Sequence, residues 1–261
     1  MYDLAALDVA LAGTIFAGKL HYSPQTDSTN ADAQTAARGG APHGSVYFAD
    51  EQLAGRGRGD HAWESAAGDG LYVSVLLRPQ ISAVRLPLLP LAVGLAAAEA
   101  IRAAAGLTVD LRWPNDLLLS PRKVGGILLE SKTSGSSVDF AVVGVGINVH
   151  QRAFALDLAT PATSLDLEAG RRVSRQDLLV FLLKSLERET LGLADPAAGS
   201  TIPARVEQAS TWIRGRRVEV HGPQACTGVT AGLDAHGFLR VQTADRMVTL
   251  QTGGIRAVEI G

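Results

Sequence analysis

The sequence predicts an α+β protein with a mixed or antiparallel sheet packed against helices. Its 261 residues, 46% of them apolar, are enough to bury a core without disulfides or structural metals. Helix-period segments alternate with runs of β-branched and aromatic residues, and two of these runs are almost continuously apolar, as central strands are. After Pro203 the chain changes to short β-rich runs separated by glycine and proline. We therefore expect residues 1–212 to form one domain and residues 213–261 a small SH3-like β-barrel.

Helices are predicted by apolar spacing and by residues that begin or end a helix. The N-cap cluster Asp27–Asn30 introduces one helix, which Gly39 and Gly40 end. A strong amphipathic pattern predicts another helix that ends at Gly106. The predicted helices are Leu4–Ala17, Ala31–Arg38, Leu86–Ala105 and Arg175–Leu191.

Strands are expected where β-branched and aromatic residues gather between turn residues. A long, polar, glycine-rich connection separates the first two strands, and such a connection inside a compact domain is usually functional or disordered. The predicted strands are Ser45–Asp50, Gly70–Leu77, Val109–Trp113, Leu117–Leu119, Val124–Ser131 and Phe140–Asn148, followed by Arg217–His221, Cys226–Leu233, Phe238–Gln242 and Met247–Gln251.

Composition excludes several classes of function. The 24 basic and 26 acidic residues leave a net charge of -2, so we expect no nucleic-acid partner, which would require a clustered positive excess. The single cysteine, Cys226, permits neither an internal disulfide nor a cysteine-rich zinc site, which favours a reducing cytoplasm. The longest apolar runs are too short and too rich in proline for a membrane span. We therefore expect a cytoplasmic protein with no membrane partner and no metal site of its own.

The first candidate site is Gly55-Arg56-Gly57-Arg58-Gly59-Asp60, in the long connection. Glycines let backbone N–H groups turn toward a ligand, and the arginines between them would complete a cradle for phosphates. The segment matches neither the dinucleotide-binding glycine pattern nor a Walker A loop. A phosphate cradle and a flexible surface loop both stay open on this segment alone.

The second candidate is Arg112-Trp113-Pro114-Asn115-Asp116 with Lys123. Ordinary hairpin chemistry explains the proline and the asparagine. It does not explain Lys123, one of only four lysines beside 20 arginines, at the start of an apolar strand. A lysine at the end of a buried strand, facing an acid from the adjoining turn, suits activation of an acyl or phosphoryl group.

Two shorter patterns complete the set. Gly144-Val145-Gly146-Ile147-Asn148 closes a strand, where glycine indicates either a bulge or the close approach of a ligand or another backbone. Ser28-Thr29-Asn30 either caps a helix or grips the polar head of a ligand.

Together and in this order, these motifs resemble those of the biotin protein ligases. The resemblance spans residues 28–148, and the C-terminal β-module also matches the family. It implies a catalytic domain like that of class II aminoacyl-tRNA synthetases, followed by an SH3-like barrel. The residues that carry it are Ser28–Asn30, Gln52, Ala54–Arg58, Trp63, Trp113–Asp116, Lys123, Gly125, Gly126, Glu130 and Val143–Asn148.

The resemblance implies a two-step reaction. The carboxylate of biotin attacks the α-phosphate of ATP, which Mg²⁺ accompanies, and the resulting biotinyl-5′-AMP gives its biotinyl group to a lysine of a biotin carboxyl carrier protein domain. Lys123, Arg58 and Asp116 would be catalytic, with Asp116 orienting or deprotonating the incoming amine. The implied biotin-binding residues are Ser28, Thr29, Asn30, Gln52, Arg56, Gly57, Arg58 and Lys123, and the implied nucleotide-binding residues are Gly55, Arg58, Trp63, Asn115 and Asn148.

Two alternatives stay open, a lipoate or octanoate transferase and a non-catalytic, biotin-sensing regulator. The intact glycine-arginine loop and the Trp-Pro-Asn-Asp motif speak against the transferase. The loop departs from the fuller family pattern, because Gly59-Asp60-His61 replaces Arg-Gly-Arg, which bears on how tightly the adenylate is retained. Too few residues precede the catalytic domain for a DNA-binding winged helix, so we expect no repressor activity. A monomer and a homodimer are equally compatible with the sequence.

Overall fold

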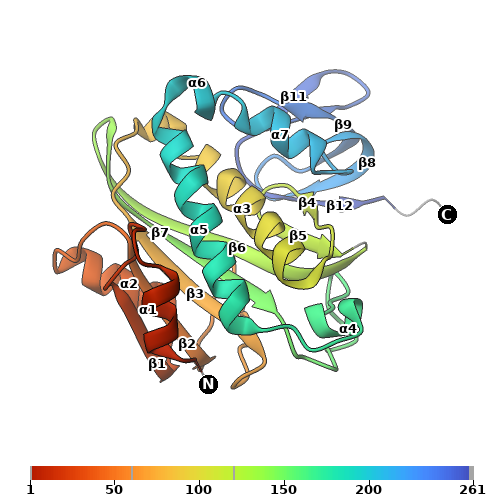
Figure 1. Cartoon of the computed structure of the whole chain (residues 1–261). Coiled ribbons are helices and arrows are strands. Elements are labelled where there is room, and N and C mark those ends of the chain that lie inside the picture. Colours follow the sequence, from red (N-terminus) through yellow and green to blue (C-terminus); the bar gives the residue numbers. More distant parts are fainter. Residues whose placement is uncertain (1, 60, 120, 259–261) are drawn as a thin grey trace.

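The computed structural model describes residues 2–59, 61–119 and 121–258. Across these residues, seven strands form the main sheet in the order β1-β2-β3-β7-β6-β5-β4. Strands β1 and β2 are parallel and the other neighbours are antiparallel, which confirms a mixed sheet (Figure 1). The strands are β1 (Leu20–Thr26), β2 (Ser45–Gln52), β3 (Gly70–Leu77), β4 (Asp110–Arg112), β5 (Asp116–Leu119), β6 (Arg122–Ser134) and β7 (Ser137–Asn148).

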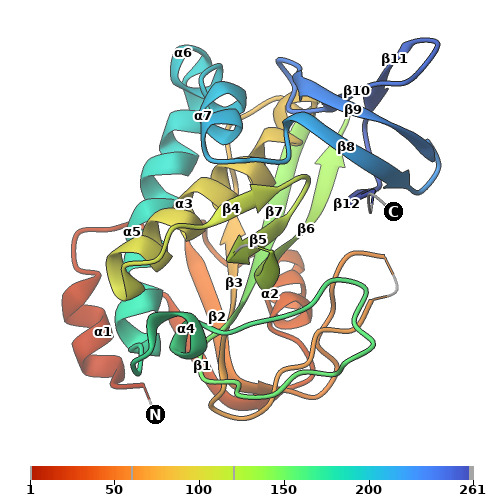
Figure 2. The ribbon, with the colours of Figure 1, turned by 90° about the vertical axis from the view of Figure 1, so that its right-hand side faces the viewer.

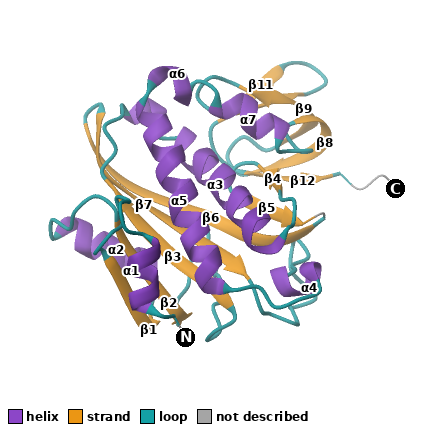
Figure 3. Ribbon diagram, viewed as in Figure 1, coloured by secondary structure: helices purple, strands orange, loops and turns teal. Residues whose placement is uncertain are grey.

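Helices cover both faces of this sheet. Figure 3 shows α1, α3 and α5 in front of the sheet and the fainter α2 behind it. Strand β3 contributes side chains to the packing on both faces of the sheet, because successive side chains of a strand point to opposite faces. Val73 and Val75 join the large core with α3 and α5. Leu76 packs with Ala33 and Ala37 of α2. The helices are α1 (Leu4–Ala10), α2 (Thr29–Arg38), α3 (Leu88–Ala105), α4 (Leu165–Ala169), α5 (Arg175–Ala194), α6 (Pro196–Gly199) and α7 (Ile202–Gln208), with a 3-10 turn at Ala83–Arg85.

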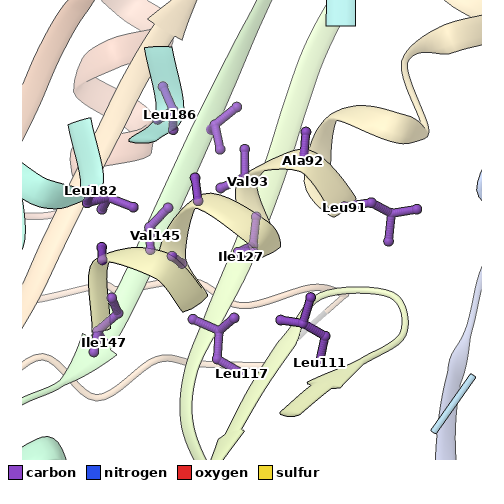
Figure 4. Packing of buried hydrophobic residues seen from close by; sticks show 14 of the residues in the cluster. Leu91, Ala92, Val93, Leu111, Leu117, Ile127, Val145, Ile147, Leu182 and Leu186 are labelled. Atoms are coloured by element: carbon purple, nitrogen blue, oxygen red, sulfur yellow. The ribbon is translucent and has the colours of Figure 1, made fainter. Parts of the chain in front are cut away.

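Helix α3 runs through the centre of the core. In Figure 4, its Val93 lies near Ile127 and Val145 of the sheet and Leu186 of α5. The helix ends at Gly106, whose φ of 76° is in the left-handed region that favours glycine. Contrary to the sequence-based expectation, α3 is long and apolar enough to cross a membrane, but 61% of it is buried inside the protein. This burial is typical of a core helix.

The chain after α7 forms a second, antiparallel sheet. Its five described strands follow the order β11-β10-β9-β8-β12. Strands β11 and β12 at its edges do not pair with each other among the described residues, so the expected barrel is an open sheet here. Figure 2 shows this sheet at one end of the molecule, beside α7. The indole Nε1 of Trp113 donates to the carbonyl of Gly237 at 3.1 Å and thereby joins the two sheets. The strands are β8 (Arg214–His221), β9 (Cys226–Leu233), β10 (Leu239–Gln242), β11 (Met247–Leu250) and β12 (Gly254–Ala257).

Several elements differ from the sequence predictions. The first helix ends at Ala10 and not at Ala17, because the chain turns through Gly13, whose φ is 80°. Strands β1 and β12 have no predicted counterpart, because both are edge strands with few buried side chains. Helices α4, α6 and α7 have none either, because each is too short to show a helical period.

Candidate functional site

Lys123 and Asp116 form an ion pair between two neighbouring antiparallel strands. Asp116 starts β5, and Lys123 lies at the start of β6, which pairs with β5. The Nζ atom of Lys123 is 2.6 Å from Oδ1 of Asp116. The lysine side chain is 27% exposed and the aspartate side chain 15%, so the ammonium group is the more accessible partner. The lysine therefore faces the acid of the adjoining turn, as its place in the sequence predicts.

A second cation holds the other oxygen of Asp116. Arg112 donates to Oδ2 from Nε at 3.0 Å and from Nη2 at 2.7 Å. Its guanidinium also lies over the ring of Trp212, 5.2 Å from the centroid. Burial alone would raise the pKa of Asp116, but the charges and hydrogen bonds of Lys123 and Arg112 hold that pKa below its ordinary value. Asp116 is therefore an ionised acceptor with both oxygens engaged.

Arg58 connects the glycine-arginine loop to the C-terminal sheet. Its Nη1 donates to the carbonyl of Gly253 at 2.9 Å and to Oδ1 of Asn115 at 3.4 Å. Arg58 and Asn115 line a cleft of about 330 Å³, whose walls also include Phe238 of the C-terminal part. Burial lowers the pKa of the Arg58 guanidinium and the charge of Asp116 opposes this, yet an arginine in a protein stays charged. The loop thus places a permanent cation at the edge of the cleft.

Trp63 covers a floor of glycines. A Cβ atom on Gly146 would lie 2.7 Å from the indole ring of Trp63, and one on its strand neighbour Gly126 would lie 3.6 Å from it. The pairing of β3 with β7 is regular at Gly146, so a close approach and not a bulge explains this glycine. The Nζ of Lys123 lies 5.5 Å from the centre of the indole ring. The ring, the glycines and the lysine therefore border one site.

A row of polar side chains runs from β6 to the end of β2. Asn30 donates from Nδ2 to Glu130 at 2.8 Å and accepts at Oδ1 from Ser74 at 2.5 Å. The hydroxyl oxygen of Ser74 is 2.8 Å from that of Thr29. The backbone N–H of Thr29 donates to Oε1 of Gln52 at 3.0 Å. Three of the residues implied for biotin, Thr29, Asn30 and Gln52, therefore belong to one hydrogen-bonded row.

The glycine-arginine loop contacts both ends of this row. Nη2 of Arg56 lies 3.2 Å from the Glu130 carboxylate. At the other end, Gln52 donates from Nε2 to Ser65 at 2.8 Å, and the Ser65 hydroxyl donates to the carbonyl of Trp63 at 3.2 Å. The position of the loop and the orientation of the polar row thus depend on each other.

Asn148 is connected to the backbone of Lys123 by two hydrogen bonds, both of which involve Thr163. It donates from Nδ2 to the carbonyl of Thr163 at 3.0 Å, and the Thr163 N–H donates to the carbonyl of Lys123 at 2.9 Å. Ser28 is the N-cap of α2 by position, yet its side chain makes no capping hydrogen bond among the described contacts. Simple helix capping therefore does not account for Ser28.

The loop glycines shape the loop itself. A Cβ atom on Gly55 would lie 2.8 Å from the hydroxyl oxygen of Ser65. The N–H of Gly57 donates to the carbonyl of His61 at 2.7 Å, which closes the loop tip. Asp60, part of the departure from the family pattern, lies outside the described residues.

Three polar residues have contacts in the site but no predicted role, although one of them, Arg112, begins the second candidate motif. Arg112 is the only charged residue between Leu111 and Asp116, directly before the Trp-Pro-Asn-Asp motif. Ser74 is the only serine in β3 and has apolar neighbours, Val73 and Val75, on both sides, and Ser65 follows the loop. A polar residue isolated in a buried strand is the signal that could identify Ser74 and Arg112. Within the described ranges, no three His, Cys, Asp or Glu side chains come together as a metal site.

Comparison with known proteins places the chain in a family. Residues 22–148 match the Biotin/lipoate A/B protein ligase family. The chain is 34% identical to the biotin--[acetyl-CoA-carboxylase] ligase of Mycobacterium tuberculosis, over 88% of this chain and 86% of that protein. It is 37% identical to the bifunctional ligase/repressor BirA of Bacillus spizizenii over 65% of this chain, and the match spans about half of that relative, 53% of its length.

A solved structure has the same fold. The biotin protein ligase of Aquifex aeolicus in complex with biotin and ATP superposes with a TM-score of 0.78 at 28% identity, over 92% of this chain and all of that one. The match to a relative that is more than 30% identical along most of both chains decides the assignment. The chain belongs to the biotin protein ligase family.

Proposed function

We propose that the protein is an ATP-dependent ligase that attaches biotin to a lysine of a biotin carboxyl carrier protein domain. The relative named biotin--[acetyl-CoA-carboxylase] ligase and the Aquifex structure described with biotin and ATP support this activity. The structural observation that carries the proposal is the Lys123–Asp116 pair, 2.6 Å apart, beside the glycine floor under Trp63.

In the first step, an oxygen of the biotin carboxylate attacks the α-phosphorus of ATP. The bond between that phosphorus and the oxygen bridging to the β-phosphate breaks, and pyrophosphate leaves. Two anions must meet, so the step requires cations placed in advance. Lys123 supplies a compact ammonium group from β6, and Arg58 supplies a guanidinium group from the loop. We propose Gly55, Trp63, Asn115 and Asn148 as the further contacts of the nucleotide.

In the second step, the neutral amine of a carrier lysine attacks the acyl carbon of biotinyl-5′-AMP. The bond from this carbon to the phosphate oxygen breaks, AMP leaves, and the nitrogen loses a proton. The contacts of Asp116 support the orienting role expected of it, because both of its oxygens are engaged and its lowered pKa makes it a weak base. Asp116 would hold the Lys123 ammonium toward the reacting oxygens.

We propose that Mg²⁺ enters with ATP. The residues present fit this proposal, because Mg²⁺ keeps several water ligands and takes its other ligands from phosphates. A site built from several protein carboxylates is therefore not required. The described part of the chain offers no cluster of three such ligands, in keeping with a metal held mainly by the nucleotide. When bound, the ion would neutralise phosphate charge.

We further propose a cytoplasmic location, from the single cysteine, and no nucleic-acid partner, from the net charge of -2. Residues 1–212 would form the catalytic domain and residues 213–261 an SH3-like domain. The two separate sheets, joined by the bond from Trp113 to Gly237, support this division. A monomer and a homodimer both remain compatible with these features.

A lipoate or octanoate transferase is the alternative within the wider family. The polar row disfavours it, because the amides and hydroxyls of Thr29, Asn30 and Gln52 would face a head group that forms few hydrogen bonds. A biotin-sensing regulator would need the same binding site without turnover.

The test is to incubate the protein with biotin, ATP, Mg²⁺ and an apo carrier domain, and to measure the intact mass of the carrier. We expect a gain of one biotinyl group that depends on ATP. A competent carrier that gains no mass with biotin would contradict the proposal, and parallel reactions with lipoate and octanoate test the alternative. Formation of the adenylate without transfer would point to the regulator.

A further inference from the structure

Trp212 lies between α7 and β8, where the chain enters the C-terminal sheet, and two guanidinium groups lie over its ring. The Cζ atom of Arg112 is 5.2 Å and that of Arg216 is 4.5 Å from the ring centroid. Trp212 is 5% exposed and Arg112 is 8% exposed, so little water reaches this contact. The attraction between a cation and an aromatic ring is stronger when the pair is desolvated. Trp212 therefore holds the same buried cation that binds Asp116.

The guanidinium group of Arg112 is fixed in two ways. The ring limits where the group can lie, because a displacement away from Trp212 loses the attraction between cation and ring. The N–H groups of a guanidinium lie in one plane, and three hydrogen bonds orient that plane. Two of them go to Oδ2 of Asp116, and the third goes from Nη2 to Oγ1 of Thr160 at 2.9 Å. The ring and the hydrogen bonds together hold Arg112 in one position.

Arg112 contributes both geometry and charge to the Lys123–Asp116 pair. Because Arg112 holds Oδ2 of Asp116, Oδ1 is directed at Nζ of Lys123, 2.6 Å away. One ammonium and one carboxylate alone carry no net charge, whereas the three groups together carry a net charge of about +1. Stabilisation of an anionic ligand requires such an excess of positive charge. Displacement of Arg112 would therefore disturb both the direction of Lys123 and the attraction of the site for anions.

Hydrogen bonds hold the segment that carries Trp212 against β4, which carries Arg112. The backbone N–H of Leu111 donates to the carbonyl of Ala209 at 3.1 Å. The hydroxyl of Ser210 donates to the carbonyl of Leu111 and accepts from the backbone N–H of Trp212 at 3.0 Å. The position of the ring relative to Arg112 thus depends on directional bonds as well as on packing.

We propose that Trp212 is a positioning residue for adenylate formation, and that it acts through Arg112 on the Lys123–Asp116 pair. The inference rests on the proposed function, in which Lys123 brings the biotin carboxylate and the α-phosphate together. Trp212 supplies no group to the reaction. Its ring keeps Arg112 on Oδ2 of Asp116, and this keeps the Lys123 ammonium group in the direction set by Oδ1.

Three substitutions test this series of contacts. Trp212→Leu removes the aromatic face and leaves an apolar side chain in the core. Trp212→Phe keeps a smaller aromatic face, which attracts a cation less strongly. Arg112→Met removes the charge and the hydrogen bonds while keeping a long side chain. The matched control is Arg205→Met. Arg205 also donates two hydrogen bonds to one carboxylate, that of Glu189, at 2.8 and 2.6 Å, but this pair joins α7 to α5.

The experiment is biotin-dependent exchange of pyrophosphate into ATP, combined with a double-mutant cycle. We expect Trp212→Leu and Arg112→Met each to slow the exchange on the order of 10-fold or more, because misplacement of a group in the site costs rate. Trp212→Phe should lose less, and Arg205→Met should match the wild type. In the Arg112→Met background, both Trp212 substitutions should cost no further activity, because the ring then has no cation of the site to position.

The pH dependence of the exchange gives a second readout. Burial raises the pKa of Asp116, but the charges and hydrogen bonds of Lys123 and Arg112 hold that pKa below its ordinary value. Arg58 also interacts with the charge of Asp116. In Arg112→Met one of these cations is missing, so the pKa of Asp116 rises and the exchange should be lost at a higher pH than in the wild type. Trp212→Leu should move the acid limb in the same direction, and the control should not move it.

The outcomes separate this inference from the proposed function. A wild type without biotin-dependent exchange contradicts the proposed function. If the wild type exchanges, and Trp212→Leu and Arg112→Met exchange as fast, the inference alone is wrong. Losses that add in the double variant, or an acid limb that stays in place, would show that Trp212 serves packing only and would also overturn the inference. If thermal melting shows that Trp212→Leu is unfolded, the cycle with Trp212→Phe decides between these outcomes.

Discussion

The ammonium nitrogen of Lys123 lies 2.6 Å from Oδ1 of Asp116, whose other oxygen, Oδ2, is held by Arg112. One largely buried carboxylate is thus shared between two cations. It fixes the direction of the Lys123 ammonium group, which is the more exposed of the two. The arrangement suits a reaction in which a carboxylate and a phosphate must be brought together, because a preorganised charge needs no reorientation during the step.

Arg58 should control how long the adenylate stays bound. We expect Arg58→Met to release biotinyl-5′-AMP on the order of 10-fold faster, because the variant lacks a charged hydrogen-bond donor. It also loses the bond to Gly253 that ties the loop to the C-terminal sheet. Retention of labelled adenylate after rapid filtration measures this rate. Arg102→Met, on the exposed side of α3, is the control, and slower or unchanged release from the Arg58 variant would count against this role of Arg58.

Asp116 should stabilise the protein only where it is ionised. Its folded-state pKa lies below the ordinary 3.8, so its contribution is fully present above that value and is lost as the pH falls through the folded-state pKa. We expect Asp116→Asn to lower the free energy of unfolding by about 3 kcal/mol near neutral pH, since two cations lose their partner. Urea unfolding across the acid range should show this difference shrinking.

The control for Asp116→Asn is Asp8→Asn, an exposed aspartate on α1, which should change the free energy of unfolding little at any pH. A loss in Asp116→Asn that stays constant into the acid range would show that charge is not its cause.

Two neighbouring glycines should respond differently to a methyl group. Gly146→Ala would place a Cβ atom 2.7 Å from the ring of Trp63, so we expect a loss of about 1–3 kcal/mol in the free energy of unfolding. Gly126→Ala would make contacts of 3.5 Å, an ordinary van der Waals distance, and should lose much less. Equal stability of the two variants in urea unfolding would refute the packing of Trp63 on β7.

The sequence predicts the centre of the fold better than its edges. Strand β3 is buried on both faces and mostly apolar, and α3 has a clear helical period, so both are predicted almost to their ends. Strands β1 and β12 lie at sheet edges, where burial imposes little pattern. Closure of a barrel depends on how edge strands meet, which no local pattern encodes, and the C-terminal sheet is open in the described residues.

In the site, contacts between residues close in sequence are predictable and contacts between distant residues are not. The pair of Asp116 and Lys123 is predictable, because a short hairpin brings the two residues together. The contact of Arg58 with Gly253 joins residues 195 positions apart, and that of Asn30 with Glu130 joins residues 100 apart. Such partners follow from the order of the strands in the sheet, and one residue's neighbours in sequence do not reveal them.

The most direct test of the account is biotin-dependent exchange of pyrophosphate into ATP, measured for the wild type, Lys123→Ala and Lys184→Ala. Lys184 is exposed on α5 and serves as the matched control. We predict that the wild type and Lys184→Ala exchange at similar rates and that Lys123→Ala is slower on the order of 100-fold or more. Absence of biotin-dependent exchange in the wild type, or equal rates for the two lysine variants, would contradict the account.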